Sequence, residues 1–232
     1  MARNDSSRRW YLFDYGNVIS TAPTPEDWEV LAEATGTPDL QAPTSRYWLH
    51  RYAYDAGAVT ADEYWTLVCG ESVSRTRAAW LDALDGNQWS HPNLETLDVL
   101  EDLEARGEQL ALLSNMPATM VSQHADAPWT RLFRHLFFSS SLRLVKPTPA
   151  VFEHVLAELG ADPARVIFVD DSPQNIAAAA ALGLDARLFS PASDLSAMLA
   201  RSDSAAPGRR PEDPPASAAR GLQPVISSAV PE

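Results

Sequence analysis

The chain is short of cysteine and of long apolar runs. Cys69 is its only cysteine, which excludes an internal disulfide, and we interpret it as a small buried side chain. No apolar run approaches the roughly 20 residues that a membrane helix needs, and the opening MARNDSSRRW lacks the apolar stretch of a signal peptide. We therefore expect no membrane association and a cytoplasmic location.

Basic residues are also scarce. The 232 residues carry a formal net charge of -13, whereas binding a nucleic-acid backbone requires a broad basic surface. A single phosphate needs only a local pocket of donors and one cation. The composition thus argues against nucleic acid as a partner and leaves a small phosphorylated substrate open.

Lysine is nearly absent. Of the 18 lysine and arginine residues, only Lys146 is a lysine. A compact ammonium and a planar guanidinium are not interchangeable, so a single lysine suggests a confined position that requires a point charge. Chance is the alternative, and the residues around Lys146 have to decide between the two.

Hydrophobic residues make up 45% of the chain, enough for a substantial core. Short apolar runs that end in small polar or acidic residues predict buried parallel strands. They are WYLFD (10–14), LALLSN (110–115), HLFFSS (135–140) and VIFVDD (166–171). Helical patterns separate these runs after residue 90, which predicts an α/β fold with a doubly wound parallel sheet.

Composition divides the chain into three parts. Residues 20–88 contain helix-compatible segments such as PEDWEVLAEATG and no clear strand, which predicts a helical insert after the first strand. The expected core then comprises residues 10–19 and 89–200. Residues 201–232 are rich in proline, alanine and serine and lack aromatic residues, so we expect a disordered tail.

Polar side chains follow the predicted strands where ligands bind in open α/β sheets, outside the carboxyl ends. They are Asp14, Ser114 with Asn115, and Asp170 with Asp171, and Lys146 lies in the sequence between the last two strands. Sparse carboxylates suit Mg²⁺, which also takes waters and phosphate oxygens as ligands. A lysine and hydrogen-bond donors suit a transferring phosphoryl group.

Each of these elements has an alternative interpretation. Asp14 alone is compatible with a helix cap or a turn, Ser114 and Asn115 with a turn, and Lys146 with a loop before a helix. Asp170 and Asp171 are more informative, because two buried like charges need a cation or a proton. Capping of the following helix explains only one of the two.

The order of the segments FDYGNVI, LLSN, VKPTPAVF and FVDDSPQNIAAA resembles the four-motif signature of the haloacid dehalogenase superfamily, over residues 10–190. This resemblance implies a Rossmann-like core with a helical cap inserted after the first motif. The segments FDYGNVI and YDAGAVTADEYW look closest to the sugar-phosphate phosphatase branch, of the glucose-1-phosphate type.

The resemblance implies roles for single residues. Asp14 becomes the nucleophile that forms an aspartyl-phosphate, and Lys146 the motif lysine beside it. Mg²⁺ would be held by Asp14, Asp171 and the carbonyl of Gly16, with Asp170 and Asn175 as candidate supports. The phosphate or substrate contacts carried over are Ser114, Asn115 and Asn17. The implied reaction is hydrolysis of a small phosphomonoester such as a sugar phosphate.

Two positions depart from the family pattern. Gly16 stands where most phosphatases of the superfamily carry a second Asp, a general acid and base worth roughly two to four powers of ten in rate. Arg143 replaces a small residue before the motif lysine, either as an extra phosphate contact or as a solvated side chain. The alternative functions are therefore those of a dehalogenase, or of a phosphate-binding or regulatory protein that has little turnover because of Gly16.

Overall fold

The computed structural model describes residues 9–191 and 193–200, and the predicted tail at 201–232 lies outside the described residues. Its strands are β1 Trp10–Phe13, β2 Gln109–Ser114, β3 His135–Phe138, β4 Val166–Asp170 and β5 Asp185–Leu188. They form one parallel sheet in the order β3-β2-β1-β4-β5. The predicted doubly wound α/β fold is thereby confirmed.

Four of these strands coincide with the apolar runs of the sequence. Every residue of β1, β2 and β4 is buried, as expected for inner strands of a sheet covered on both faces. The fifth strand, β5, was not predicted. Its sequence DARL contains two charged residues and is only partly buried, because β5 lies at the edge of the sheet.

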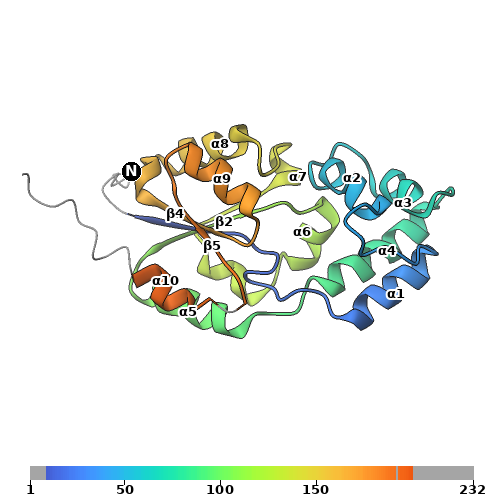
Figure 1. Ribbon diagram of the computed structural model, residues 1–232, viewed down its shortest axis with the longest axis horizontal. Coiled ribbons are helices and arrows are strands. Elements are labelled where there is room, and N and C mark those ends of the chain that lie inside the picture. Colours follow the sequence, from blue (N-terminus) through green and yellow to red (C-terminus); the bar gives the residue numbers. More distant parts are fainter. Residues whose placement is uncertain (1–8, 192, 201–232) are drawn as a thin grey trace, which may run out of the picture. The chain divides into compact units, whose positions relative to one another are not determined.

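Residues 25–88 form four consecutive helices between β1 and the rest of the sheet: α1 Pro25–Thr35, α2 Arg46–Asp55, α3 Ala61–Cys69 and α4 Arg75–Gln88. Local sequence sets the ends of α1. Thr24 and Asp27 form a capping box at its start, and Gly36 ends it with a φ of 69°. These helices lie beyond the carboxyl ends of the strands (Figure 1).

The four helices have their own hydrophobic cluster, with Leu31, Tyr47, Tyr64, Trp65 and Leu81 among its most buried members. A separate cluster is typical of a distinct compact module. We call residues 25–88 the cap. The boundaries at residues 19/20 and 88/89 remain a prediction.

The other helices accompany the sheet. They are α5 Leu94–Ala105, α6 Ala118–His124, α7 Ser139–Leu142, α8 Pro149–Leu159, α9 Pro173–Ala181 and α10 Leu195–Ala200, with 3-10 turns at Pro128–Leu132 and Pro163–Arg165. Helices α8 and α9 cover one face of the sheet and α5 covers the other (Figure 1). This is the layered arrangement of a doubly wound fold.

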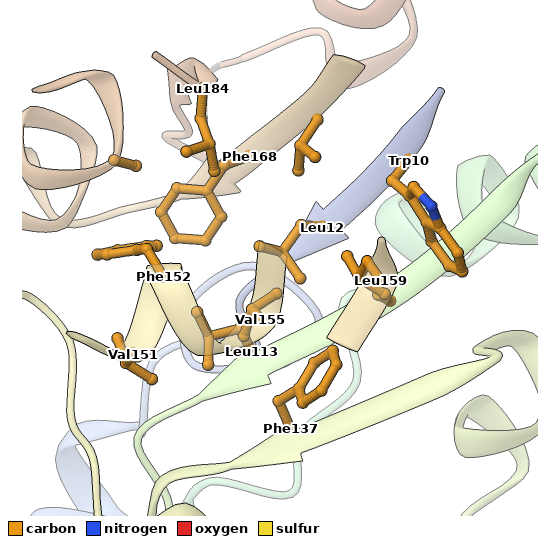
Figure 2. Packing of buried hydrophobic residues seen from close by; sticks show 13 residues of the cluster. Trp10, Leu12, Leu113, Phe137, Val151, Phe152, Val155, Leu159, Phe168 and Leu184 are labelled. Atoms are coloured by element: carbon orange, nitrogen blue, oxygen red, sulfur yellow. The ribbon is translucent and has the colours of Figure 1, made fainter. Parts of the chain in front are cut away.

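The core beneath α8 fixes that helix on the sheet. Phe152 of α8 packs edge-on against Phe168 of β4, with ring centroids 5.3 Å apart. Leu12 of β1 and Leu113 of β2 complete the contact with Val155 (Figure 2). Because the loop that carries Lys146 leads directly into α8, this packing also determines where the lysine lies.

Candidate active site

The strand order brings three polar strand ends together. Strand β1 pairs with β2 on one side and with β4 on the other, with Phe13 opposite both Leu112 and Val169. Asp14 follows β1 directly, and its backbone N–H donates to the carbonyl of Val169 at 2.9 Å. The carboxyl ends of all three strands therefore lie next to one another, as the sequence predicted.

Lys146 lies between these strand ends. Its ammonium is 2.7 Å from Oδ1 of Asp14 and 2.7 Å from Oδ2 of Asp170. Only 1% of the residue is exposed. A guanidinium would need more room and more hydrogen-bond acceptors than this enclosed position offers. The one lysine of the chain thus occupies a confined site between two carboxylates.

Asn115 holds the lysine loop in place. Its side-chain amide donates to the carbonyl of Lys146 at 2.9 Å, and its side-chain oxygen accepts from the N–H of Lys146 at 2.9 Å. The sequence suggested a phosphate contact at this position. That contact stays a prediction, and the structure shows in addition two reciprocal hydrogen bonds to a backbone 31 residues away, which no local pattern in the sequence reveals.

Asp170 is fixed on its other side by the start of α9. Nδ2 of Asn175 lies 3.0 Å from both of its carboxylate oxygens, and the N–H of Ser172 donates to Oδ1 at 2.8 Å. The helix itself begins at Pro173 and is capped by Ser172, whose hydroxyl accepts from the N–H of Asn175. Neither aspartate of the pair is therefore the side chain that caps α9.

Asp171 faces the loop after β1. Its Oδ2 accepts a 2.8 Å hydrogen bond from Nδ2 of Asn17, which has a φ of 56°. That left-handed conformation is tolerated by Asn better than by most residues. Asn17, predicted as a substrate contact, thus orients an acid of the cluster, and the adjacent Gly16 lines the same pocket.

Three carboxylates converge around one ammonium. Oxygens of Asp14, Asp170 and Asp171 all lie within 4.8 Å of one another. Three acids against the single Lys146 leave a formal charge of -2 when all are ionised. Closely spaced oxygen ligands with excess negative charge fit a hard divalent cation such as Mg²⁺.

The protonation behaviour of the cluster reflects this crowding. Burial, together with the neighbouring charges of Asp170 and Asp171, raises the pKa of Asp14 to about 7, although Lys146 opposes the shift. Burial alone would lower the pKa of Lys146, yet the charges of Asp14 and Asp170 outweigh it and raise that pKa. The lysine is therefore a permanent cation, while Asp14 needs further positive charge to stay fully ionised.

A pocket of about 780 Å³ opens over these residues. The side formed by the strand ends is lined by Asp14, Lys146, Asp171 and Ser114, which is the last residue of β2. The opposite side is lined by residues of the cap. The pocket is large enough for a small metabolite and places it against the predicted site residues.

Gly16 stands two residues after Asp14 and offers this pocket no acid at that position. A Cβ at this position would lie 3.8 Å from Cζ3 of Trp89, an ordinary contact. The indole of Trp89 therefore borders the catalytic loop directly. Trp89 was not predicted as a site residue, because its position beside Gly16 depends on tertiary packing across 73 residues of chain.

Arg143 does not reach the pocket. It adopts a left-handed conformation with a φ of 59°, and its guanidinium donates to the carbonyl of Gly57 in the cap. Neither residue lines the pocket. The suggestion of an extra phosphate contact at Arg143 is thus replaced by a contact between the cap and the loop before Lys146.

The match to a family model assigns the chain to a class. The model of haloacid dehalogenase-like hydrolases matches residues 41–183, more than half of the chain, and the chain belongs to this family. The matched segment includes Ser114, Lys146 and Asp171 but begins beyond Asp14. The position of Asp14 in the site therefore rests on the geometry described above.

Curated relatives match a smaller part of the chain. A sesquiterpene phosphatase from Aspergillus oryzae is 31% identical over 94 residues, 40% of this chain and 48% of the relative. A phosphoglycolate phosphatase from Haemophilus influenzae is 34% identical over 94 residues, 40% of this chain and 41% of the relative. The chain thus spans about half, or less, of the length of these relatives.

Solved structures share the fold over most of the chain. A HAD family enzyme from Bacteroides thetaiotaomicron, in complex with magnesium and inorganic phosphate, has a TM-score of 0.64 at 21% identity, covering 83% of this chain and 99% of that chain. An L-2-haloacid dehalogenase from Xanthobacter autotrophicus with covalently bound chloropropionic acid has a TM-score of 0.60 at 20% identity, covering 86% and 85%. None of the helices in the described ranges has the length and apolar character needed to cross a bilayer.

Proposed function

We propose that the protein is a Mg²⁺-dependent phosphomonoesterase that acts on a small phosphorylated metabolite. The observation that carries this proposal is the position of Asp14, whose carboxylate lies 2.7 Å from the buried ammonium of Lys146 and within 4.8 Å of the oxygens of Asp170 and Asp171. A nucleophile, a fixed cation and ligands for a divalent metal are thereby combined at the floor of a pocket.

In the proposed reaction a carboxylate oxygen of Asp14 attacks phosphorus in line with the ester oxygen. The new bond forms an aspartyl-phosphate, the P–O bond to the leaving group breaks, and the leaving oxygen takes a proton from water. Water then hydrolyses the aspartyl-phosphate and releases inorganic phosphate. Lys146 stabilises the charge on the phosphoryl oxygens, and Ser114 donates a hydrogen bond to them.

Asp14, Asp171 and the carbonyl of Gly16 would hold Mg²⁺, with Asp170 beside them. Bound there, the ion supplies positive charge that keeps Asp14 ionised and neutralises the phosphate. Asp170 acts differently from Asp171, because its oxygens are already engaged by Lys146, Asn175 and Ser172. Its proposed role is to position Lys146.

Two relatives with phosphatase names and a structural neighbour that holds magnesium and phosphate support this proposal. The motif form suggests a sugar phosphate as one substrate.

A dehalogenase is the second candidate, because a haloacid dehalogenase shares the fold and Gly16 leaves no second acid after Asp14. The excess negative charge of the Asp14, Asp170 and Asp171 cluster favours the metal-dependent phosphatase, since attack on a carbon–halogen bond needs no such cluster.

The test measures phosphate released from p-nitrophenyl phosphate and a panel of sugar phosphates, with Mg²⁺ and with EDTA. We expect release only with the metal, and its loss in Asp14→Asn. Asp98→Asn, an exposed acid on α5, is the matched control and should behave as the native protein. Chloride release from 2-chloropropionate in EDTA would instead support the dehalogenase. Absence of both activities would favour a binding protein.

A further inference from the structure

The cap side of the pocket is an aromatic wall. Trp28 and Trp48 line it with ring centroids 6.1 Å apart, and Trp48 and Trp89 line it with centroids 6.5 Å apart. Trp89 in turn borders Gly16, two residues from Asp14. The three indoles thus lie in a row from the loop after β1 into the cap, where Trp28 is largely buried, and we call this row the indole wall.

Among the described residues, no surplus positive charge lies beside the wall. Of the described residues that line the pocket, Arg51 and Lys146 are the basic ones. Lys146 is shared between Asp14 and Asp170. Arg51 therefore decides whether the cap can receive a second anionic group of a substrate.

Arg51 is neutralised within the cap. Its Nε lies 2.8 Å from Oδ1 of Asp55, and its Nη1 lies 2.8 Å from Oδ2 of Asp85. All three residues are buried. One guanidinium against two carboxylates leaves a formal charge of -1 when both acids are ionised. Arg51 and Asp55 both line the pocket and Asp85 lies buried behind them, so the group offers a ligand a net negative charge and no unpaired cation.

From these observations we infer that the substrate is a phosphomonoester whose leaving group is uncharged and presents an apolar face to the indole wall. This inference rests on the proposed phosphatase function and deepens it. An indole binds flat apolar surfaces such as an aryl or terpenoid group, or the C–H face of a sugar. A second carboxylate or phosphate on the substrate would be desolvated beside Asp55 without a free cation, which disfavours it strongly.

The first test compares phosphoglycolate with its neutral amide, at pH 8 and with Mg²⁺. The two esters have the same size and the same primary leaving oxygen, and differ by one negative charge. We expect kcat/KM for the amide to exceed that for phosphoglycolate by about tenfold, the effect of one unit charge at intermediate distance and dielectric. A kcat/KM for phosphoglycolate that equals or exceeds that for the amide would overturn the inference. The proposed phosphatase function would still hold in that case.

The variant Asp55→Asn links this discrimination to Arg51. Asn can still accept from Nε of Arg51 but removes one negative charge from the pocket wall. We expect the ratio of kcat/KM for the amide to kcat/KM for phosphoglycolate to decrease several-fold. An unchanged ratio would show that Asp55 and Arg51 do not determine charge selectivity.

The indole wall is tested with benzyl phosphate against propyl phosphate, which share a primary leaving oxygen. We expect benzyl phosphate to have the higher kcat/KM, by roughly tenfold or more. Trp48→Ala should reduce this preference, whereas Trp80→Ala, an exposed tryptophan outside the pocket, should not. No preference in the native protein would contradict the role of the wall.

Glucose 1-phosphate and farnesyl phosphate distinguish the two sources of an apolar face. A higher kcat/KM for glucose 1-phosphate assigns the wall to a sugar, and a higher value for farnesyl phosphate assigns it to a terpenoid. Hydrolysis of neither, with rapid hydrolysis of phosphoglycolate, would overturn the inference. Absence of hydrolysis for all these esters would instead contradict the phosphatase proposal itself.

Discussion

The ammonium of Lys146 lies 2.7 Å from Oδ1 of Asp14, and the two residues are 132 positions apart in the chain. The loop before α8 carries one and the end of β1 carries the other. Asn115, directly after β2, holds that loop through two hydrogen bonds to the backbone of Lys146. The pair therefore depends on three separate segments of the folded core.

We expect Lys146→Met to reduce kcat by about 10²–10³-fold, because a fixed cation beside the phosphoryl group is lost. Removing one partner of a buried ion pair should also lower the free energy of unfolding by roughly 3–5 kcal/mol in EDTA. Urea denaturation and phosphatase assays measure both effects. Lys146→Arg should not restore activity, and near-native kcat in that variant would show that a confined point charge is not required.

Gly16→Asp should introduce the missing general acid. A Cβ at position 16 would make only an ordinary contact with Trp89, so the backbone there tolerates a side chain. We expect kcat for alkyl phosphates to rise by on the order of 10²-fold, with little change for p-nitrophenyl phosphate, whose leaving group needs no proton. Gly16→Ala is the matched control, and an equal effect in both variants would point to sterics rather than proton transfer.

Asp55 should make the stability of the protein depend on pH. Burial raises its pKa from 3.8 to about 6, although Arg51 opposes the shift. A raised carboxyl pKa means that the folded state binds the proton more tightly, so this contribution to stability is present at low pH and is lost as pH rises through about 6.

The free energy of unfolding of the native protein minus that of Asp55→Asn should therefore fall by roughly 1–1.5 kcal/mol between pH 5 and pH 7.5. Urea denaturation of both proteins at the two pH values measures the difference. A difference that stays constant, or that grows with pH, would show that Asp55 is ionised throughout this range in the folded state.

Phe152→Ala should lower the free energy of unfolding by roughly 3–5 kcal/mol, because it leaves a cavity between α8 and the sheet. Figure 2 shows this side chain next to Phe168 within the core. Leu94→Ala provides the comparison, since Leu94 is 66% exposed and its loss should change stability by no more than about 0.5 kcal/mol. Similar losses in both variants, by urea denaturation, would contradict this account of the core.

The apolar runs and their polar ends predicted much of the fold and the positions of Asp14, Ser114, Asp170 and Asp171. Burial on both faces makes inner strands apolar throughout, so they are visible in a sequence. Edge strand β5 escaped detection because Asp185 and Arg187 interrupt its apolar pattern.

The cap side of the pocket could not be predicted in the same way. Of the aromatic residues of the cap, Trp28, Trp48 and Tyr52 line the pocket, although Trp28 also belongs to the buried cluster of the cap. Others are buried in that cluster (Tyr47, Tyr54, Tyr64 and Trp65), and Trp80 is exposed elsewhere. All have the same chemical character, and only the packing of α1–α4 decides which of them face a ligand. The neutralisation of Arg51 by Asp55 and Asp85 likewise depends on contacts between helices.

Trp89 belongs at once to the wall that receives the leaving group and to the surroundings of Gly16. Substitutions at the two positions should therefore show epistasis, with effects that deviate from additivity by more than the 0.5 kcal/mol or so found for distant sites. Selection for a new substrate at residue 89 would change the setting in which an acid at residue 16 has to work. With such epistasis, a change of specificity at residue 89 and a change of catalytic rate at residue 16 could not be selected independently.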